Sequence, residues 1–276
     1  MKNFFIKKNN NNKNLRQVRI GDDVTSIGAE AFYSCPSLNT ALIGKSILKI
    51  DKYAFYNCNS LKFISIGNKI EFIGNYTFYN CMSLTSMPIG NSLTSIGGHA
   101  FYNCKLIPSL IIGNSVPILG DYACYNCESL NTLTIGENVE IIGQYAFYNS
   151  TSLITVTIPE SVKRVEQWAF MNCKSLTTLT INTTDTIYFG NKVFWYCDKL
   201  TTIYHYSVKE PNFNYSKQCG DPETICAASP TTAVSCSPFY CNKQPITVYV
   251  PNNYEAWLFN EFCDKPVTLK LLSSVG

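Results

Sequence analysis

The sequence predicts an α/β repeat protein in which short parallel strands stack into a solenoid. The first observation is a cysteine column that recurs every 23 residues, with one Ser and a last step of 24: Cys35, Cys58, Cys81, Cys104, Cys127, Ser150, Cys173 and Cys197. The second is that Leu or Ile stands three residues after each member, and Phe stands three before, except at Cys124. Such a period indicates stacked units. With 276 residues, 46% of them apolar, the chain can bury a core, which excludes wholesale disorder.

Each unit has the consensus LxxLxIGxxVxxIGxxAFYNCxS. The Leu-x-x-Leu-x-Ile part ends in an alternation of inward and outward residues, so it predicts a short parallel strand. The Ile-Gly step predicts a turn of the chain. The segment Ala-Phe-Tyr-Asn-Cys has room only for a helical or 3₁₀ turn on the far, convex side. Because one unit cannot cover its own core, it must stack on its neighbours.

The spacing and the AFYNC-type segment resemble the 23-residue leucine-rich repeat of the BspA-like family, which comprises surface antigens of bacteria and parasitic protists. The resemblance covers residues 15–206, where eight consecutive units agree in at least four columns. It implies a right-handed leucine-rich-repeat solenoid with adhesive or protein-binding use, often at a cell surface, and no catalytic residues. The chain departs from simple members of the family in its Asn-rich, basic start and its Cys-rich end.

Three regions are predicted along the chain: a flexible, basic, Asn-rich lead at residues 1–14, the solenoid of about eight repeats at 15–206, and a Cys-rich segment at 207–276. The last region is divided further, because the period returns after residue 237. Phe239 precedes Val248 by nine residues, as Phe170 precedes Leu179. We therefore predict an insertion at 207–237, a final degenerate repeat, and a C-terminal cap that shields the open end of the core.

The cysteine column is predicted to face the core, where a thiol acts as a small apolar filler. Cys124 and Cys127 have the C-x-x-C spacing of redox motifs, but both fall in inward columns, which favours packing. The other five cysteines have irregular spacing among Pro and Gly. Disulfides that pin a loop-rich cap fit them better than a zinc site and imply an oxidising exterior, with the pairing left open. The candidates for these disulfides are Cys219, Cys226, Cys236, Cys241 and Cys263.

Residues five and seven positions after each member of the cysteine column must point away from the core. In the eight full units these positions hold mostly Ser and Thr and no charged residue. An enzyme needs a nucleophile with its base, or paired carboxylates, in one pocket. This surface offers neither, so no catalytic residue, cofactor or metal site is predicted. It suits an uncharged contact with a protein, although Thr also favours strands for structural reasons alone. The candidate binding residues are Phe63, Ile111, Thr132, Thr134, Thr155, Thr157, Thr178, Thr180 and Tyr204.

Two aromatic columns follow the opposite flank: Tyr33, Tyr56, Tyr79, Tyr102, Tyr125, Tyr148, Met171 and Trp195, and Tyr53, Tyr76, His99, Tyr122, Tyr145 and Trp168. Such residues are common in binding surfaces. Their place beside the core Phe residues favours packing between repeats instead. His99 fills a Tyr slot and His205 an Ile slot, so neither is predicted to be a catalytic base.

The net charge of +3 is too small to predict nucleic-acid binding, and no apolar run has the length of a membrane helix. We therefore predict a non-enzymatic protein-binding or adhesion module, a surface or secreted antigen that contacts host, matrix or other cell proteins. No signal peptide is recognisable, which supports the alternative of a cytoplasmic scaffold or regulator. A third hypothesis, ice binding, rests on three stacked Thr-x-Thr motifs, but the flanking rows lack the motif. No oligomeric state is predicted.

Overall fold

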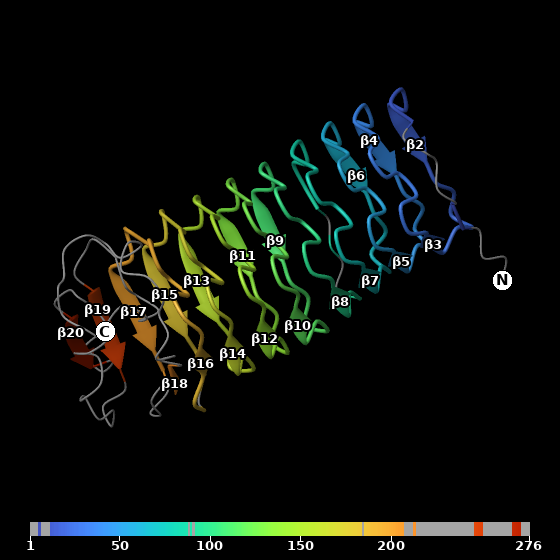
Figure 1. The fold of residues 1–276 in the computed structure, drawn as a ribbon. Helices are drawn as coiled ribbons and strands as arrows, with labels where there is room; N and C mark the ends of the chain where they lie inside the picture. The colour runs from blue at the N-terminus through green and yellow to red at the C-terminus, as the bar shows by residue number, and fades with distance from the viewer. Residues whose placement is uncertain are drawn as a thin grey trace.

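The chain winds into coils that stack along one axis, from the N-terminal end in blue to the C-terminal end in red (Figure 1). The computed structural model describes residues 5–6, 12–87, 89, 92–183, 185–206, 212–213, 246–250 and 267–271. Two files of strands run along the stack, and the strands that are paired lie parallel, each with the equivalent strand of a neighbouring coil. The predicted parallel-strand solenoid of about eight turns is therefore confirmed.

One file, which we call the narrow sheet, consists of two-residue strands, and from its second strand to its ninth the first residue faces outward and the second inward. Its strands are β1 (Phe5–Ile6), β3 (Ser26–Ile27), β5 (Lys49–Ile50), β7 (Phe72–Ile73), β8 (Ser95–Ile96), β10 (Ile118–Leu119), β12 (Ile141–Ile142), β14 (Arg164–Val165), β16 (Tyr188–Phe189) and β18 (Asn212–Phe213). The inward residues from β3 to β16 are all buried. These strands lie along the lower edge of the stack in Figure 1.

The other file, which we call the broad sheet, has longer strands in three blocks: β2 (Gln17–Arg19), β4 (Thr40–Leu42) and β6 (Phe63–Ser65); β9 (Ser109–Ile111) and β11 (Thr132–Thr134); and β13 (Thr155–Ile158), β15 (Thr178–Ile181), β17 (Thr202–His205), β19 (Ile246–Val250) and β20 (Val267–Leu271). Between the first two blocks, residues 85–87 of the intervening coil are described and form no strand.

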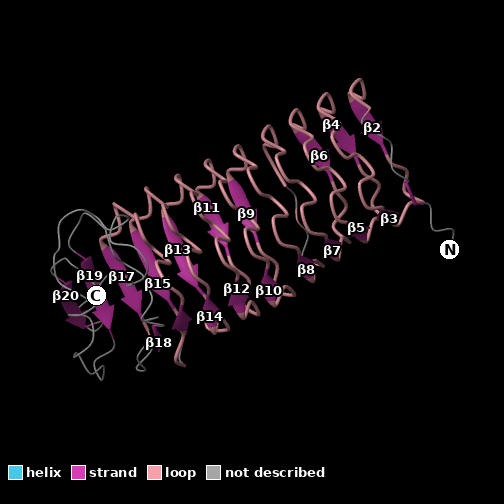
Figure 2. Ribbon diagram, in the orientation of Figure 1, coloured by secondary structure: helices cyan, strands magenta, loops and turns pink. Residues whose placement is uncertain are grey.

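The side that carries the Ala-Phe-Tyr-Asn-Cys segments, which we call the turn flank, has no helix in the described coils (Figure 2). The prediction of helical or 3₁₀ turns is wrong here. In the second coil Tyr53 and Asn57 have φ values of 60° and 57°, and a right-handed helix requires negative φ at every residue. The N–H of Phe55 donates to the carbonyl of Thr77 in the next coil over 2.9 Å. Backbone donors that bond to the next coil thus alternate with donors that bond locally, such as the N–H of Tyr56 to the carbonyl of Tyr53.

The cysteine column lies in the core as one file of buried thiols, as predicted. Cys58, Cys81 and Cys104 are fully buried, and each Sγ donates to the carbonyl of the Phe 26 residues earlier over 3.1 to 3.2 Å. The same bond extends from Cys127, Cys173 and Cys197. Beside this file the Phe rings stack in register, with centroids 5.0 Å apart for Phe32 and Phe55. A thiol at this position therefore fills space and also ties each coil to the preceding one.

Ser150 is the exception in the column, because its buried hydroxyl has no hydrogen-bond partner. The longer C–S bond lets a thiol reach the carbonyl that a hydroxyl does not. We expect Ser150→Cys to raise the free energy of unfolding by about 1 to 2 kcal/mol, because an unpaired buried polar group is replaced by a bonded one. Urea unfolding under reducing conditions measures the change. Ser150→Ala, which removes the hydroxyl but adds no bond, is the control, and it should gain less. A loss of stability in Ser150→Cys would contradict the prediction.

Both ends differ in part from the regions predicted there. Val248 in β19 pairs with Ile203 in β17, the place that its spacing from Phe239 predicts. Strand β1 lies within the predicted flexible lead but pairs with β3, and β20 adds a strand where only a cap is predicted. The five cysteines predicted to form disulfides lie outside the described residues, and so does most of the 207–237 insertion. The division into three regions stays a prediction.

Among the described residues, no helix has the length and apolar character needed to cross a membrane. The same part of the chain contains no cluster of three or more His, Cys, Asp or Glu side chains arranged to hold a metal ion.

Candidate binding surface

The outward side of the broad sheet, which we call the broad face, carries the candidate residues. Alternation along each strand puts them there: in Thr155–Ile158 the first and third residues are exposed while the second and fourth are buried. Every candidate residue lies on this face, and none is buried. Phe63 and Ile111 are the most exposed of the apolar ones, at 47% and 55%. The sequence pattern therefore located the outward rows correctly.

Threonines align across the C-terminal strands of the broad face. One row runs through paired residues of five successive strands: Thr155, Thr178, Thr202, Thr247 and Thr268. Sequence analysis did not include the last two, because the 23-residue period is lost before β19. Parallel strands lie about 4.8 Å apart, so the row presents hydroxyl and methyl groups at regular intervals.

The row beside these threonines carries two aromatic residues near its C-terminal end. Thr157 and Thr180 are followed in register by Tyr204, Tyr249 and Lys270. The rings of Tyr204 and Tyr249 stack with centroids 4.8 Å apart, and the Lys270 Nζ lies 5.8 Å from the Tyr249 centroid. Tyr249, like Thr247, is a surface residue that the candidate set missed.

Charge is confined to the two ends of the broad face. In the described broad-sheet strands from β4 to β19, every outward residue is uncharged, and the first charged ones beyond them are Arg19 in β2 and Lys270 in β20. Such a surface can bury area against an uncharged partner surface without desolvating an ion.

The titratable groups of the core do not supply a reactive site. Burial raises the pKa of the Cys58 thiol to about 12, and it raises the pKa of Cys81, Cys104 and Cys124 well above the usual value. A thiol attacks as its thiolate, so these groups are unreactive near neutral pH. The packing interpretation of Cys124 thus agrees with its fully buried position.

The two aromatic columns of the turn flank stack ring on ring between coils. Centroid distances are 4.5 to 4.9 Å from Tyr33 to Tyr148 and 4.4 to 4.9 Å from Tyr53 to Trp168. This stacking confirms that the columns pack between repeats. His99 lies within the second column, where burial lowers its pKa against the opposing effect of Asp121. A neutral imidazole in a ring stack has a structural role.

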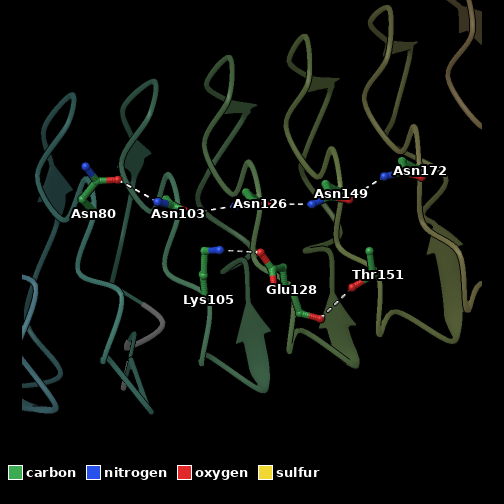
Figure 3. A network of polar contacts seen from close by, with 8 residues as sticks. All are labelled: Asn80, Asn103, Lys105, Asn126, Glu128, Asn149, Thr151 and Asn172. Carbon is green, nitrogen blue, oxygen red and sulfur yellow. Dashed lines mark hydrogen bonds and ion pairs between the residues drawn. The ribbon is translucent and has the colours of Figure 1, made fainter.

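Beside these rings runs an asparagine ladder that sequence analysis did not identify (Figure 3). Each amide donates from Nδ2 to Oδ1 of the preceding one, over 2.9 Å between Asn103 and Asn80, and the same residues have positive φ. Its members are Asn57, Asn80, Asn103, Asn126, Asn149 and Asn172. The signal was the Asn before each Cys, since Asn tolerates the left-handed region. Because the amides bond to one another, we assign the ladder to packing between coils. The broad face therefore remains the candidate binding surface.

Comparison with known proteins agrees with this architecture. A family model described as BspA type leucine rich repeat region (6 copies) matches residues 7–127 and 117–244. A leucine-rich repeat protein from Bacteroides ovatus has a similar solved structure, with a TM-score of 0.55, 19% identity, and coverage of 93% of this chain and 92% of that chain. The leucine rich repeat protein of T. pallidum has a TM-score of 0.49 and 26% identity, with coverage of 67% and 78%. A leucine rich cell surface protein from Faecalibacterium prausnitzii has a TM-score of 0.42 and 20% identity, with coverage of 74% and 80%.

No curated protein matches the chain. The likeness to the Bacteroides ovatus protein shows the fold alone at this level of identity. The family match, in contrast, spans most of the sequence and includes all members of the cysteine column. This chain belongs to the BspA-type leucine-rich-repeat family.

Proposed function

We propose that the protein is a non-enzymatic binding module that holds a protein partner against the broad face. The observation that supports this most directly is the uncharged outward surface from β4 to β19, on which Phe63 and Ile111 stand 47% and 55% exposed. Exposed apolar side chains on a rigid sheet can be buried in an interface with little loss of conformational entropy. A solenoid presents such a surface over many coils at once, which suits an extended protein contact.

We place this module on the cell surface or outside the cell, in contact with host, matrix or other cell proteins. The resemblance to surface antigens and the predicted disulfides near the C-terminus support this location. Staining of intact, unpermeabilised cells tests it. Staining that requires permeabilisation would instead favour the cytoplasmic scaffold.

The binding surface is tested by placing charge on it. We expect the double variant Phe63→Asp, Ile111→Asp to lower the affinity for a captured protein partner at least tenfold, since an unpaired carboxylate would be buried in the contact. The partner is first identified by capture from the surface proteins of intact cells or from purified matrix proteins. Biolayer interferometry then measures the affinity of each variant for that partner. The control is Ile118→Asp, which changes an equally apolar residue, 52% exposed, on the narrow sheet.

The control variant should bind as the unchanged protein does. If Ile118→Asp weakens binding while the broad-face variant does not, the partner uses the narrow sheet, and the proposed surface is wrong. If no surface or matrix protein binds the unchanged protein, the proposed function fails as a whole.

A further inference from the structure

The broad face has a step near its C-terminal end, where tall side chains follow short ones. Tyr204 and Tyr249 stack with an angle of 20° between their rings. On the other side of Tyr204 the residue in register is Thr180, followed by Thr157. A threonine is much shorter than a tyrosine, and among the described residues no ring stacks on this second face of Tyr204. We call Thr157, Thr180, Tyr204 and Tyr249 together the Tyr204 shelf.

Hydroxyl groups surround the open ring face. Thr157 and Thr180 lie beside it in the same row, and Thr178 and Thr202 lie in the next row. In the described part of the structure, the hydroxyls of Thr157 and Thr180 form no hydrogen bond with another side chain or with the backbone. They are therefore available to donate to, or accept from, a ligand that rests on the ring.

Among the described residues, the broad-sheet strands from β4 to β15, on the Thr180 side of the shelf, carry no charged outward side chain. Within the described strands, the charged outward residue near the two tyrosines is Lys270, which pairs with Tyr249 and so lies on the far side of the stack from Thr180. A charged ligand on the threonine side would lose hydration without gaining an opposite charge. A ligand that combines an apolar face with a rim of hydroxyls and no charge would match all three features. A pyranose sugar has this chemistry, because its C–H groups form the face and its hydroxyls the rim.

We infer that the Tyr204 shelf binds a neutral glycan, with one pyranose ring stacked on Tyr204 and its hydroxyls bonded to Thr157 and Thr180. This site goes beyond the proposed protein-binding function, since it takes another class of ligand. It also lies several coils away from Phe63. The threonine row through Thr155 and Thr178 continues the surface along which further sugar units would lie.

The test uses the full chain with neutral hexasaccharides of β-glucose, xylose, mannose and N-acetylglucosamine as probes. Saturation-transfer NMR detects contact, and calorimetry measures affinity. We expect at least one probe to bind with a dissociation constant of about 0.1 to 5 mM, as for a small polar contact. Tyr204→Ala should weaken that binding at least tenfold. Tyr206→Ala, which removes a 48% exposed tyrosine just beyond β17, is the matched control and should bind as before.

A second variant keeps both tyrosines in place. Thr180→Tyr puts a ring where Tyr204 is open, so it should extend the stack, preserve the fold and abolish glycan binding. Retention of binding in both Tyr204→Ala and Thr180→Tyr would overturn the inference, as would an absence of binding by all probes up to about 10 mM. Binding of acidic glycans only would also overturn it. The double variant Phe63→Asp, Ile111→Asp should bind the glycan normally, so the failure of one proposal is distinguishable from the failure of the other.

Discussion

Raising the pH from 9 to 12 should unfold this protein, because its core thiols can ionise only when the chain opens. Burial raises the pKa of Cys58 from the ordinary value of 9.0 to about 12, and it raises that of Cys81 and Cys104 well above 9.0. A group whose pKa is higher in the folded state contributes stability that is complete below its unfolded pKa. That stability is lost as the pH rises toward the folded pKa. The window for these thiols is therefore about pH 9 to 12.

The size of the effect follows from the same linkage. For Cys58 alone, the rise in pKa from 9.0 to about 12 corresponds to a loss of about 4 kcal/mol of folding stability by pH 12. A whole domain is stable by only about 5 to 15 kcal/mol. The tyrosine column adds to the loss above pH 10, since burial and neighbouring tyrosines raise the pKa of Tyr125 to about 12. Urea unfolding at pH 7, 9, 10 and 11, with a phosphine reductant to prevent oxidation, measures the decline. We expect several kcal/mol to be lost between pH 9 and 11.

Cys58→Ala is the matched variant for this prediction. It should be less stable at pH 7, because it loses a packed group and the bond to the Phe32 carbonyl. It should also lose stability less steeply with pH, by up to about 1.4 kcal/mol per pH unit, since one fewer thiol ionises on unfolding. An unfolding free energy that stays constant from pH 9 to 11 in the unchanged protein would mean that the thiols are not protected by the fold.

The direction of each side chain was predictable from the sequence, because it depends only on the offset from the cysteine column. Cys58 faces inward and Thr155 outward for that reason. The backbone of the turn flank was not predictable in the same way. An Ala-Phe-Tyr-Asn segment has the composition of a helical turn, and nothing in it shows that the Phe55 N–H bonds to the next coil. In the structure, local bonds such as that from the Tyr56 N–H to the Tyr53 carbonyl alternate with bonds between coils, and a single repeat does not contain the second kind.

The candidate surface was likewise predictable from the sequence only in part. The outward rows from β4 to β17 follow from the period, whereas Thr268 and Lys270 in β20 follow from pairing with β19 across a segment where the period is lost. The step at Tyr204 needed knowledge of which residues are in register on both of its sides. Sequence analysis named Tyr204 but did not compare it with Thr180 and Tyr249, so the open ring face was recognised only in the structure.

The Ile-Gly step was predicted to turn the chain, and the structure adds what its glycine does there, which leads to a sharp test. A turn would use glycine for its positive φ, yet no described glycine has one. What requires glycine is close approach between coils: a Cβ on Gly44 would lie 2.4 Å from the Gly21 carbonyl oxygen. We expect Gly44→Ala to lower the free energy of unfolding by about 2 to 3 kcal/mol, because two coils must separate to admit the methyl group. Urea unfolding of the purified variant measures the loss.

Gly21→Ala is the control for this substitution, since Gly21 occupies the same position of the first coil and a Cβ there would meet no atom of the described residues within 4 Å. It should be neutral or more stable by up to about 1 kcal/mol, because alanine restricts the unfolded chain. Equal losses in the two variants would show that backbone conformation, not coil spacing, requires the glycine.

The lengths of the broad-sheet strands support coil spacing as the cause. Where the column holds Gly the broad-sheet strands have three residues, as in β4, and where it holds Pro159 or Asn182 they have four, as in β13 and β15. Glycine at this position thus allows adjacent coils to approach closely where the strand ends one residue earlier.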